Sequence, residues 1–275
     1  MNGTLWVVAT PIGNLGDLSP RALSTLRNAA LIAAEDTRHT RHLLAHFGLA
    51  TPLRAMHEHN EADVAEQLLK RLQAGEDIAL VADAGTPLIS DPGYRLVRAA
   101  RQAGLKVATV PGPSALVAAM SVAGLPSDRF VFEGFLPARQ AARCERLSTL
   151  AVETRTLIFY ESSHRIRACL ADVVSVFGAE REATLARELT KLHETVLSAS
   201  LGELAARVVI DDDQCRGELV LLVAGAKGGD EERKSCEGRR IFALLRQELP
   251  PGRAARLAAA ISGAPRRLLY EDAKE

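Results

Sequence analysis

The sequence has few cysteines, and they lie far apart. The four cysteines form no C-x-x-C pair, and no Cys/His cluster has the spacing of a zinc site. Isolated cysteines of this kind are typical of reduced thiols in a cytosolic protein. We therefore expect free thiols, and we expect no catalytic metal.

Long apolar runs are also missing. No run is long enough to span a bilayer. The first residues enter a strand-like pattern directly, without the basic segment and apolar core of a signal peptide. We expect a cytoplasmic protein with no membrane contact.

The chain has no net charge, because 34 Lys and Arg balance 34 Asp and Glu. The overall balance therefore indicates no partner. The charges are spread unevenly, since residues 233–270 hold nine Lys or Arg and only two acids, Glu237 and Glu248. A basic end on an otherwise acidic chain is a candidate nucleic-acid contact. The alternative is a solvated helical face that is merely rich in arginine.

Three common motifs are absent. The loop after the first apolar run contains only Gly13 and Gly16, and their spacing does not fit the G-x-G-x-x-G of dinucleotide-binding folds. The chain has no Gly-Lys-Ser/Thr of a phosphate-binding loop and no G-x-S-x-G nucleophile elbow. These absences argue against a Rossmann dehydrogenase, a P-loop nucleotidase and an α/β-hydrolase.

Strand-length apolar runs alternate with helical patterns along the chain, which predicts an α/β fold. We expect strands at 5–9, 31–34, 78–82, 106–110, 130–135, 156–160, 182–188, 195–201 and 217–225. We expect helices from Pro20 and at 40–47, 61–73, 94–103, 116–122, 140–150, 166–177, 239–249 and 253–261. The predicted domains are an N-terminal α/β domain (1–125), a second α/β domain (126–227), and a linker with a basic helical segment (228–275).

Three expected strands of the first domain run into loops of Gly, Pro and small polar residues, at 10–17, 83–93 and 111–115. If the sheet is parallel, these loops share one edge, where ligands bind in open α/β sheets. Small residues let a ligand approach the backbone, and free N–H groups and hydroxyls hold its polar atoms. The sequence therefore predicts a binding crevice at this edge.

Seven motifs follow one another along essentially the whole chain. They are Thr10–Asp17, Ala34–His39, Asp83–Leu88, Pro111–Ser114, Phe132–Pro137, Phe159–Ser162 and Arg187–Lys191. Together they resemble the tetrapyrrole-methylase superfamily, and in particular its branch that modifies ribosomal RNA. The first loop is less rich in glycine than in most tetrapyrrole methylases, which favours the RNA branch over a porphyrin substrate.

The resemblance implies a two-domain fold with S-adenosyl-L-methionine in the cleft between the domains, plus a small C-terminal helical segment. It implies 2′-O-methylation of a cytidine in the decoding region of 16S rRNA, within the small ribosomal subunit, by a homodimer. The alternatives are a small-molecule methylase acting on a tetrapyrrole-like ring, and a non-catalytic RNA-binding module.

The resemblance also indicates site residues. For the cofactor these are Pro11, Asp83, Ala84, Gly85, Thr86, Pro87, Leu88, Ser114, Ala115 and Tyr160. A ribose hydroxyl becomes a better nucleophile beside a base, and Asp36, Glu161 and Lys191 are the candidates, with His39 as an alternative. Methyl transfer from a sulfonium is already favourable, so positioning alone is an alternative source of rate.

Basic side chains near the predicted crevice and in the C-terminal segment are candidate RNA contacts. They are Arg38, His39, Arg139, Arg143, Arg165, Arg239, Arg240, Arg266 and Arg267. Arginine suits phosphate geometry, and RNA helices are read largely by shape and backbone. The alternative for the C-terminal arginines is a helical cap that only packs on the domain before it.

Overall fold

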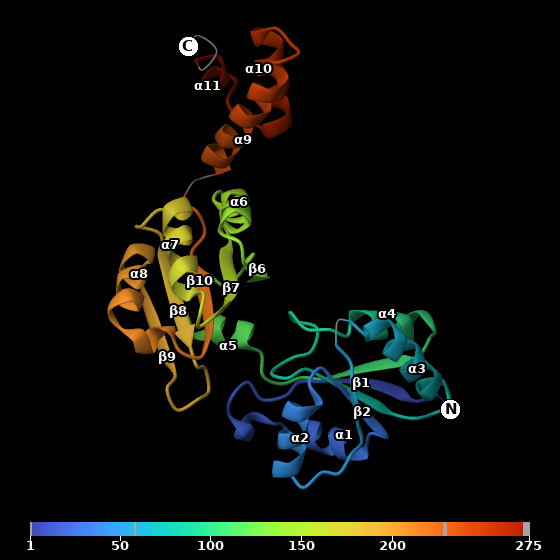
Figure 1. Ribbon diagram of the computed structural model, residues 1–275. Coiled ribbons are helices and arrows are strands. Elements are labelled where there is room, and N and C mark those ends of the chain that lie inside the picture. Colours follow the sequence, from blue (N-terminus) through green and yellow to red (C-terminus); the bar gives the residue numbers. More distant parts are fainter. Residues whose placement is uncertain (1, 58, 228–229, 272–275) are drawn as a thin grey trace.

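A computed structural model describes residues 2–57, 59–227 and 230–271. Figure 1 shows two α/β units side by side and a group of helices at the far end of the second unit. No helix among the described residues has the length and apolar character needed to cross a membrane.

The first unit is built on a parallel sheet with the strand order β3-β2-β4-β1-β5. Its strands are β1 (Thr4–Val8), β2 (Leu31–Ala34), β3 (Leu53–Ala55), β4 (Ile78–Val81) and β5 (Lys106–Val110). Both faces of the sheet are covered, as its continuous apolar strands require. Ile78 and Leu80 pack on one side with helices α3 (Glu61–Gln73) and α4 (Tyr94–Gln102).

The opposite face of this sheet packs against α1 (Pro20–Asn28) and α2 (Thr37–His46). The expected start of α1 is confirmed, because the Ser19 side chain accepts a hydrogen bond from Ala22 N and Pro20 stands at the first helical position. A short 3₁₀ helix, Leu15–Asp17, lies in the first loop.

The second unit contains a mixed sheet with the order β6-β7-β10-β8-β9. Its strands are β6 (Phe130–Phe135), β7 (Thr156–Ser162), β8 (Glu182–Arg187), β9 (Thr195–Ser200) and β10 (Glu218–Val223). Only the β6–β7 pair is parallel among the pairs described. Helices α6 (Gln140–Leu150), α7 (Ile166–Phe177) and α8 (Leu201–Ile210) pack on one face, and a 3₁₀ helix (Asp212–Cys215) precedes β10.

Helix α5 (Ala115–Val122) covers the other face of the second sheet. Its buried residues Leu116 and Ala119 pack with Ile158 on β7 and Leu222 on β10. The chain therefore crosses from one unit to the other before α5. The domain boundary at 125/126 stays a prediction, and by packing α5 goes with the second sheet.

The C-terminal helices are α9 (Asp230–Leu245), α10 (Pro251–Ser262) and α11 (Arg266–Glu271). They share a small core that includes Phe242, Ala255 and Leu269. In Figure 1 they lie beyond the α6 and α7 end of the second unit, on the side away from the first sheet. The expected linker is shorter than predicted, because α9 already begins at Asp230. Residues 228–229 lie outside the described part of the chain.

Candidate active site

The loops that leave the carboxyl edge of the first sheet are tied to one another. Thr10 and Gly85 exchange two backbone hydrogen bonds, with N···O distances of 2.9 and 3.1 Å. The Thr86 hydroxyl donates to the carbonyl of Pro113 at 2.9 Å. The three loops predicted to share one edge therefore do so, and they are held in a fixed arrangement.

A cavity of about 320 Å³ lies between these loops and the second sheet. Its volume falls within the range of small-molecule sites. Its walls come from both α/β units: Ile12, Glu35, Asp83, Ala84, Gly85, Thr86, Ile89, Ser90, Asp91, Ser114, Ala115, Phe135, Tyr160, Glu161, Leu189, Glu218, Leu219 and Val220.

The wall formed by the loop after β4 has an unusual backbone. Gly85 has φ +82°, and a Cβ there would lie 3.1 Å from Cγ2 of Ile12. Leu88 and Ser90 also have positive φ, at 73° and 70°, although neither is a glycine. Such conformations cost energy and persist where the surroundings fix them, most often at functional sites.

The cavity is lined by carboxylates from both units. Glu35, Asp83 and Asp91 contribute from the first unit, and Glu161 and Glu218 from the second. Burial and the nearby charges of Glu35 and Asp83 raise the pKa of Asp91 to about 7. Burial, followed by the charge of Asp83, also raises the pKa of Glu35. A cavity with this concentration of negative charge favours a cationic ligand.

Glu161 is the most buried of these acids, with 3% of the residue exposed. Its Oε1 accepts from the backbone N–H of Ser162 at 2.8 Å and lies 3.4 Å from Nε of Arg165. Its Oε2 has no hydrogen-bond partner among the described residues. The Cys169 thiol of α7 lies within hydrogen-bonding reach of this carboxylate, so Cys169 and Arg165 give it polar neighbours inside the fold.

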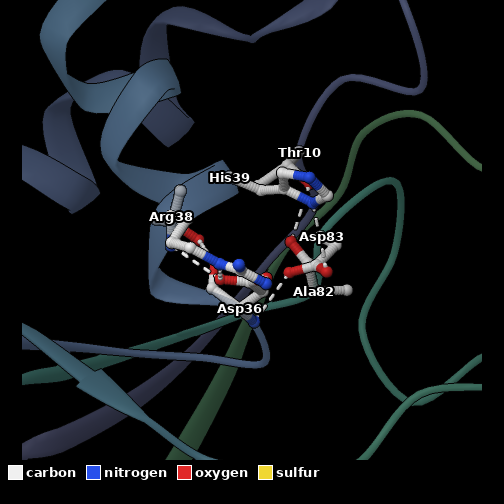
Figure 2. Close-up of polar contacts among 7 residues, drawn as sticks. Thr10, Asp36, Arg38, His39, Ala82 and Asp83 are labelled. Atoms are coloured by element: carbon white, nitrogen blue, oxygen red, sulfur yellow. Dashed lines mark hydrogen bonds and ion pairs between the residues drawn. The ribbon is translucent and has the colours of Figure 1, made fainter.

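Asp83 is positioned by the segment after β2, as Figure 2 shows. Its Oδ1 accepts from the backbone N–H of Asp36 at 2.9 Å, and its Oδ2 lies 3.3 Å from Nδ1 of His39. The carboxylate of Asp36 binds Arg38 and caps α2. Hydrogen bonds from Arg38 lower the pKa of Asp36 to about 2. Asp36 therefore lies beside the cavity wall and orients Asp83 through its backbone.

Lys191 connects the two units at the edge of the cavity. Its Nζ lies 2.7 Å from Oε1 of Glu188 and 3.1 Å from Oε2 of Glu218. Its aliphatic part lies against Gly13, where a Cβ would overlap it. Burial favours the neutral amine, but the two carboxylates outweigh burial and raise the pKa of Lys191. The ammonium thus stays charged at neutral pH, which does not suit a proton acceptor.

Comparisons with known proteins agree with this architecture. The family described as Tetrapyrrole (Corrin/Porphyrin) Methylases matches residues 4–205, and the RsmI C-terminal HTH domain matches residues 234–273. A protein of Xylella fastidiosa (strain Temecula1) named Ribosomal RNA small subunit methyltransferase I is 62% identical over 98% of both chains. One of the same name from Pseudomonas aeruginosa is 57% identical over 98% of this chain and 96% of its own.

The chain belongs to the tetrapyrrole methylase family. Among solved structures it is similar to uroporphyrin-III C-methyltransferase from Thermus thermophilus complexed with S-adenosylhomocysteine, with a TM-score of 0.55 and 18% identity. That match covers 81% of this chain and 97% of the other. At this identity the likeness shows the fold, which is the two-unit fold predicted from the sequence motifs.

Within this tetrapyrrole methylase, two predicted RNA contacts have internal partners instead. Arg143 is 4% exposed and forms an ion pair with Asp172. Arg165 donates to the carbonyls of Leu136 and Pro137 and lies beside Glu161. Because Arg143 is buried, the prediction that it contacts RNA is wrong and we assign it a structural role. Arg165 is bound to the fold but partly exposed, so its contact with RNA stays a prediction.

The other predicted RNA contacts are exposed. They lie in three places: Arg38 and His39 on α2, Arg139 before α6, and the C-terminal residues Arg239, Arg240, Arg266 and Arg267 on α9 and α11. Arg240 forms an ion pair with Glu237 at 2.8 Å on the surface of α9. An exposed pair of this kind is weak and leaves the guanidinium accessible to a phosphate.

Of the predicted cofactor residues, Asp83, Ala84, Gly85, Thr86, Ser114, Ala115 and Tyr160 line the cavity. Pro11, Pro87 and Leu88 are adjacent in sequence to lining residues. Sequence reasoning missed the lining residues Glu35, Ile89, Ser90, Asp91, Phe135, Leu189, Glu218, Leu219 and Val220 as site residues. Asp91 had a signal, because it lies in the Gly- and Pro-rich loop, whereas nothing marked the first residues of β10.

Proposed function

We propose that this chain transfers a methyl group from S-adenosyl-L-methionine to the 2′-hydroxyl of a cytidine in the decoding region of 16S rRNA. The observation that carries the proposal is the near-complete match, at 57–62% identity, to relatives named Ribosomal RNA small subunit methyltransferase I. The acidic cavity between the two units supports it, because the chemistry needs a site for a cationic methyl donor. The same substrate implies the cytoplasmic location that we expect from the sequence.

The residues present in the cavity fit S-adenosyl-L-methionine. When bound, this cofactor supplies an electrophilic methyl group on a positively charged sulfur. Carboxylates on both walls suit its positive charges. The backbone of residues 83–86 and the start of α5 at Ser114 and Ala115 would hold its polar ends.

The C-terminal helices would bind the RNA. Their segment matches the RsmI C-terminal HTH domain and carries exposed arginines on α9, α10 and α11, among them Arg240, Arg253 and Arg256. Arginine binds phosphates in a bidentate manner. We expect binding of this segment to RNA to weaken steeply as salt rises, because phosphate contacts release counterions.

The decisive experiment measures tritium transfer from labelled S-adenosylmethionine to small ribosomal subunits that lack this modification. We expect label in 16S rRNA, and nuclease mapping should place it on the ribose of one cytidine. Absence of label from RNA under these conditions contradicts the proposal. Label in a porphyrin-like ring instead would select the small-molecule methylase, and salt-sensitive RNA binding without cofactor binding would select a non-catalytic module.

The proposal includes a homodimer. Two copies would place two basic C-terminal segments in one assembly, which increases the surface available to a large RNA substrate. Sedimentation equilibrium across a concentration series tests this part separately. A single species with the mass of one chain at micromolar concentration contradicts it and leaves the methyl-transfer proposal intact.

A further inference from the structure

Two acids of the cavity, Asp91 and Glu35, have no side-chain hydrogen bond or ion pair within the described part of the chain. Asp91 lines the cavity in the loop between β4 and α4. Asp83, in contrast, is bound by the backbone of Asp36 and lies beside His39. Both oxygens of Asp91 therefore remain available to accept a proton.

The loop that carries Asp91 is held in place on both sides. Before it, Leu88 and Ser90 adopt left-handed backbone conformations. After it, the carboxylate of Glu61 accepts hydrogen bonds from the backbone N–H groups of Gly93, at 3.1 Å, and Arg95, at 2.8 Å. Glu61 is itself buried, at the start of α3. It is a positioning residue, because it fixes the backbone two residues beyond Asp91.

The loop also reaches the second unit. A Cβ on Gly134 of β6 would lie 3.1 Å from Oγ of Ser90, so the Asp91 loop and strand β6 are in contact there. The charge of Asp91 contributes to the raised pKa of Tyr160, after burial as the main cause. Asp91 thus lies where the two walls of the cavity approach each other.

The charged and titratable groups that share this cavity with Asp91 come from its own loop and from three other segments. They are Glu35 after β2, Asp83 after β4, Tyr160 and Glu161 on β7, and Glu218 at the start of β10. No Lys, Arg or His lines the cavity within the described residues. Burial and neighbouring carboxylates raise the pKa of Asp91 to about 7, so it is a stronger base than an ordinary carboxylate and is still ionised in part at neutral pH.

Glu161 lines the same cavity from the opposite unit, and its Oε2 is buried without a hydrogen-bond partner among the described residues. Its carboxylate nevertheless has polar neighbours inside the fold, because the Cys169 thiol of α7 and Nε of Arg165 lie beside it. Asp91 has no such neighbour in the described part of the chain, so its carboxylate is open to the cavity.

We propose that Asp91 is the catalytic proton acceptor for the hydroxyl group that receives the methyl. This inference rests on the proposed function. In the transfer, the hydroxyl oxygen forms a bond to the methyl carbon, the sulfur keeps the electron pair of the broken C–S bond, and the hydroxyl proton passes to the carboxylate of Asp91. The acidic neighbours keep Asp91 basic, and Glu61 keeps it in position.

The test compares the wild-type chain with Asp91→Asn in single-turnover methyl transfer to small ribosomal subunits between about pH 5.5 and 9. The wild-type rate should rise with pH and level off above about 7. Asp91→Asn should lower the rate by about 100-fold or more, the usual contribution of a general base, and should abolish this rise. Its affinity for S-adenosylhomocysteine, measured by calorimetry, should change much less than its rate.

Two variants sharpen the comparison. Asp63→Asn changes an exposed acid of α3 and should leave the pH dependence of the methyl-transfer rate unchanged. Glu35→Gln should keep a rate that rises with pH, although the curve should shift to lower pH because one carboxylate fewer acts on Asp91. The inference is wrong if the methyl-transfer rate of Asp91→Asn depends on pH as the wild-type rate does. It is also wrong if the rate of Glu35→Gln no longer rises with pH while the rate of Asp91→Asn still does.

A readout without turnover completes the test. Carbon-13 NMR of the cofactor-free protein should show a carboxyl resonance that titrates near pH 7 and is missing from Asp91→Asn. Its absence overturns the inference. If the wild-type chain transfers no methyl group to RNA at all, the proposed function itself fails. If the wild-type chain transfers the methyl group and the Asp91→Asn variant does so equally well, only the role of Asp91 fails.

Discussion

The hydroxyl of Tyr160 accepts a hydrogen bond from the backbone N–H of Leu116, with an N···O distance of 3.0 Å. Tyr160 belongs to β7, and Leu116 lies in the first turn of α5. The bond uses an N–H group that has no partner within its own helix. It attaches the start of α5 to the second sheet at the point where Ser114 and Ala115 enter the cavity wall.

Tyr160→Phe should therefore reduce both stability and ligand affinity. The free energy of unfolding should fall by about 1 kcal/mol, because the Leu116 N–H loses its acceptor in a half-buried place. Affinity for S-adenosylhomocysteine should fall several-fold as this part of the wall loosens. Urea denaturation and calorimetry measure the two effects.

Tyr94→Phe is the matched control. Tyr94 is 60% exposed, and its hydroxyl accepts only from the exposed Arg98 at 3.3 Å. Loss of that surface bond should change neither quantity measurably. If the two substitutions change stability and ligand affinity equally, the Tyr160–Leu116 hydrogen bond makes no specific contribution to either.

Gly85→Val should strongly weaken cofactor binding. Gly85 has φ +82°, and a side chain there would press on Ile12 and on the Pro113 carbonyl, both beside the cavity. We expect affinity for S-adenosylhomocysteine to fall below detection in calorimetry, while the chain stays folded in circular dichroism.

Gly104→Val separates backbone strain from the steric effect. Gly104 has a similar φ of +69°, but a Cβ there would meet nothing within 4 Å. This variant should lose on the order of 1 kcal/mol of stability from the left-handed backbone and should bind the cofactor normally. Normal binding by Gly85→Val would show that the cofactor lies elsewhere.

Arg143→Met should destabilise the second unit. Arg143 and Asp172 form a buried pair with an Nη2–Oδ2 distance of 2.6 Å, and Arg143 also donates to the carbonyls of Pro137 and Ala138. Removal of one partner leaves a buried charge without compensation, which costs about 3–5 kcal/mol. Thermal or urea unfolding measures the loss.

The exposed Arg139, the residue directly before α6, serves as the control. Arg139→Met should leave stability almost unchanged and should weaken RNA binding if this helix touches RNA. A loss of stability from Arg143→Met no larger than that from Arg139→Met would refute the structural role of the pair.

The raised pKa of Asp91 predicts a pH-dependent effect on stability. A carboxyl with a pKa of about 7 in the folded chain and about 3.9 in the unfolded chain destabilises the fold progressively as pH rises from about 4 to 7. Asp91→Asn should therefore stabilise the fold at pH 8 and not at pH 4. Because Asp91 is only partly buried, solvent reduces the gain to the order of 1 kcal/mol. Chemical denaturation at both pH values checks this, and an equal gain at both would contradict it.

Removal of the C-terminal helices should separate cofactor binding from RNA modification. A chain ending at Lys227 loses α9, α10 and α11, which have their own small core. It should bind S-adenosylhomocysteine as the full chain does, since no cavity residue is removed. Methylation of small subunits should be lost, and retention of full methylation would exclude a role of these helices in RNA recognition.

Much of the fold was predictable because apolar runs and helix signals coincide with the real elements. The strand Leu31–Ala34 and the helix Glu61–Gln73 have the predicted bounds. Strand β3 was missed, since it has only three residues, none of them is buried, and they carry little pattern. Helix α8 was missed although Ser200 and Glu203 form a capping box, because the predicted strand ended at Leu201 and no element was assigned to the residues that follow it.

The site residues that lie in one continuous loop could be predicted from the sequence. Those that come together only through contacts between distant segments could not. The Gly- and Pro-rich loop from Asp83 marked one wall of the cavity. Glu218 was not marked, because it reaches the cavity only through the pairing of β10 with β7. Arg143 was misassigned for the same reason, since its partner Asp172 lies on another helix and sequence spacing does not show that they meet.

Because the chain crosses between the units before α5, each unit supplies a different wall of one cavity. Residues 83–86 follow the first sheet, whereas Ser114 and Ala115 belong to the start of α5, which packs on the second sheet. The Thr86–Pro113 hydrogen bond joins the two walls at the crossing. The shape of the cavity therefore depends on how α5 packs on the second sheet. Substitutions that loosen α5 should accordingly weaken ligand binding even where they touch no ligand atom.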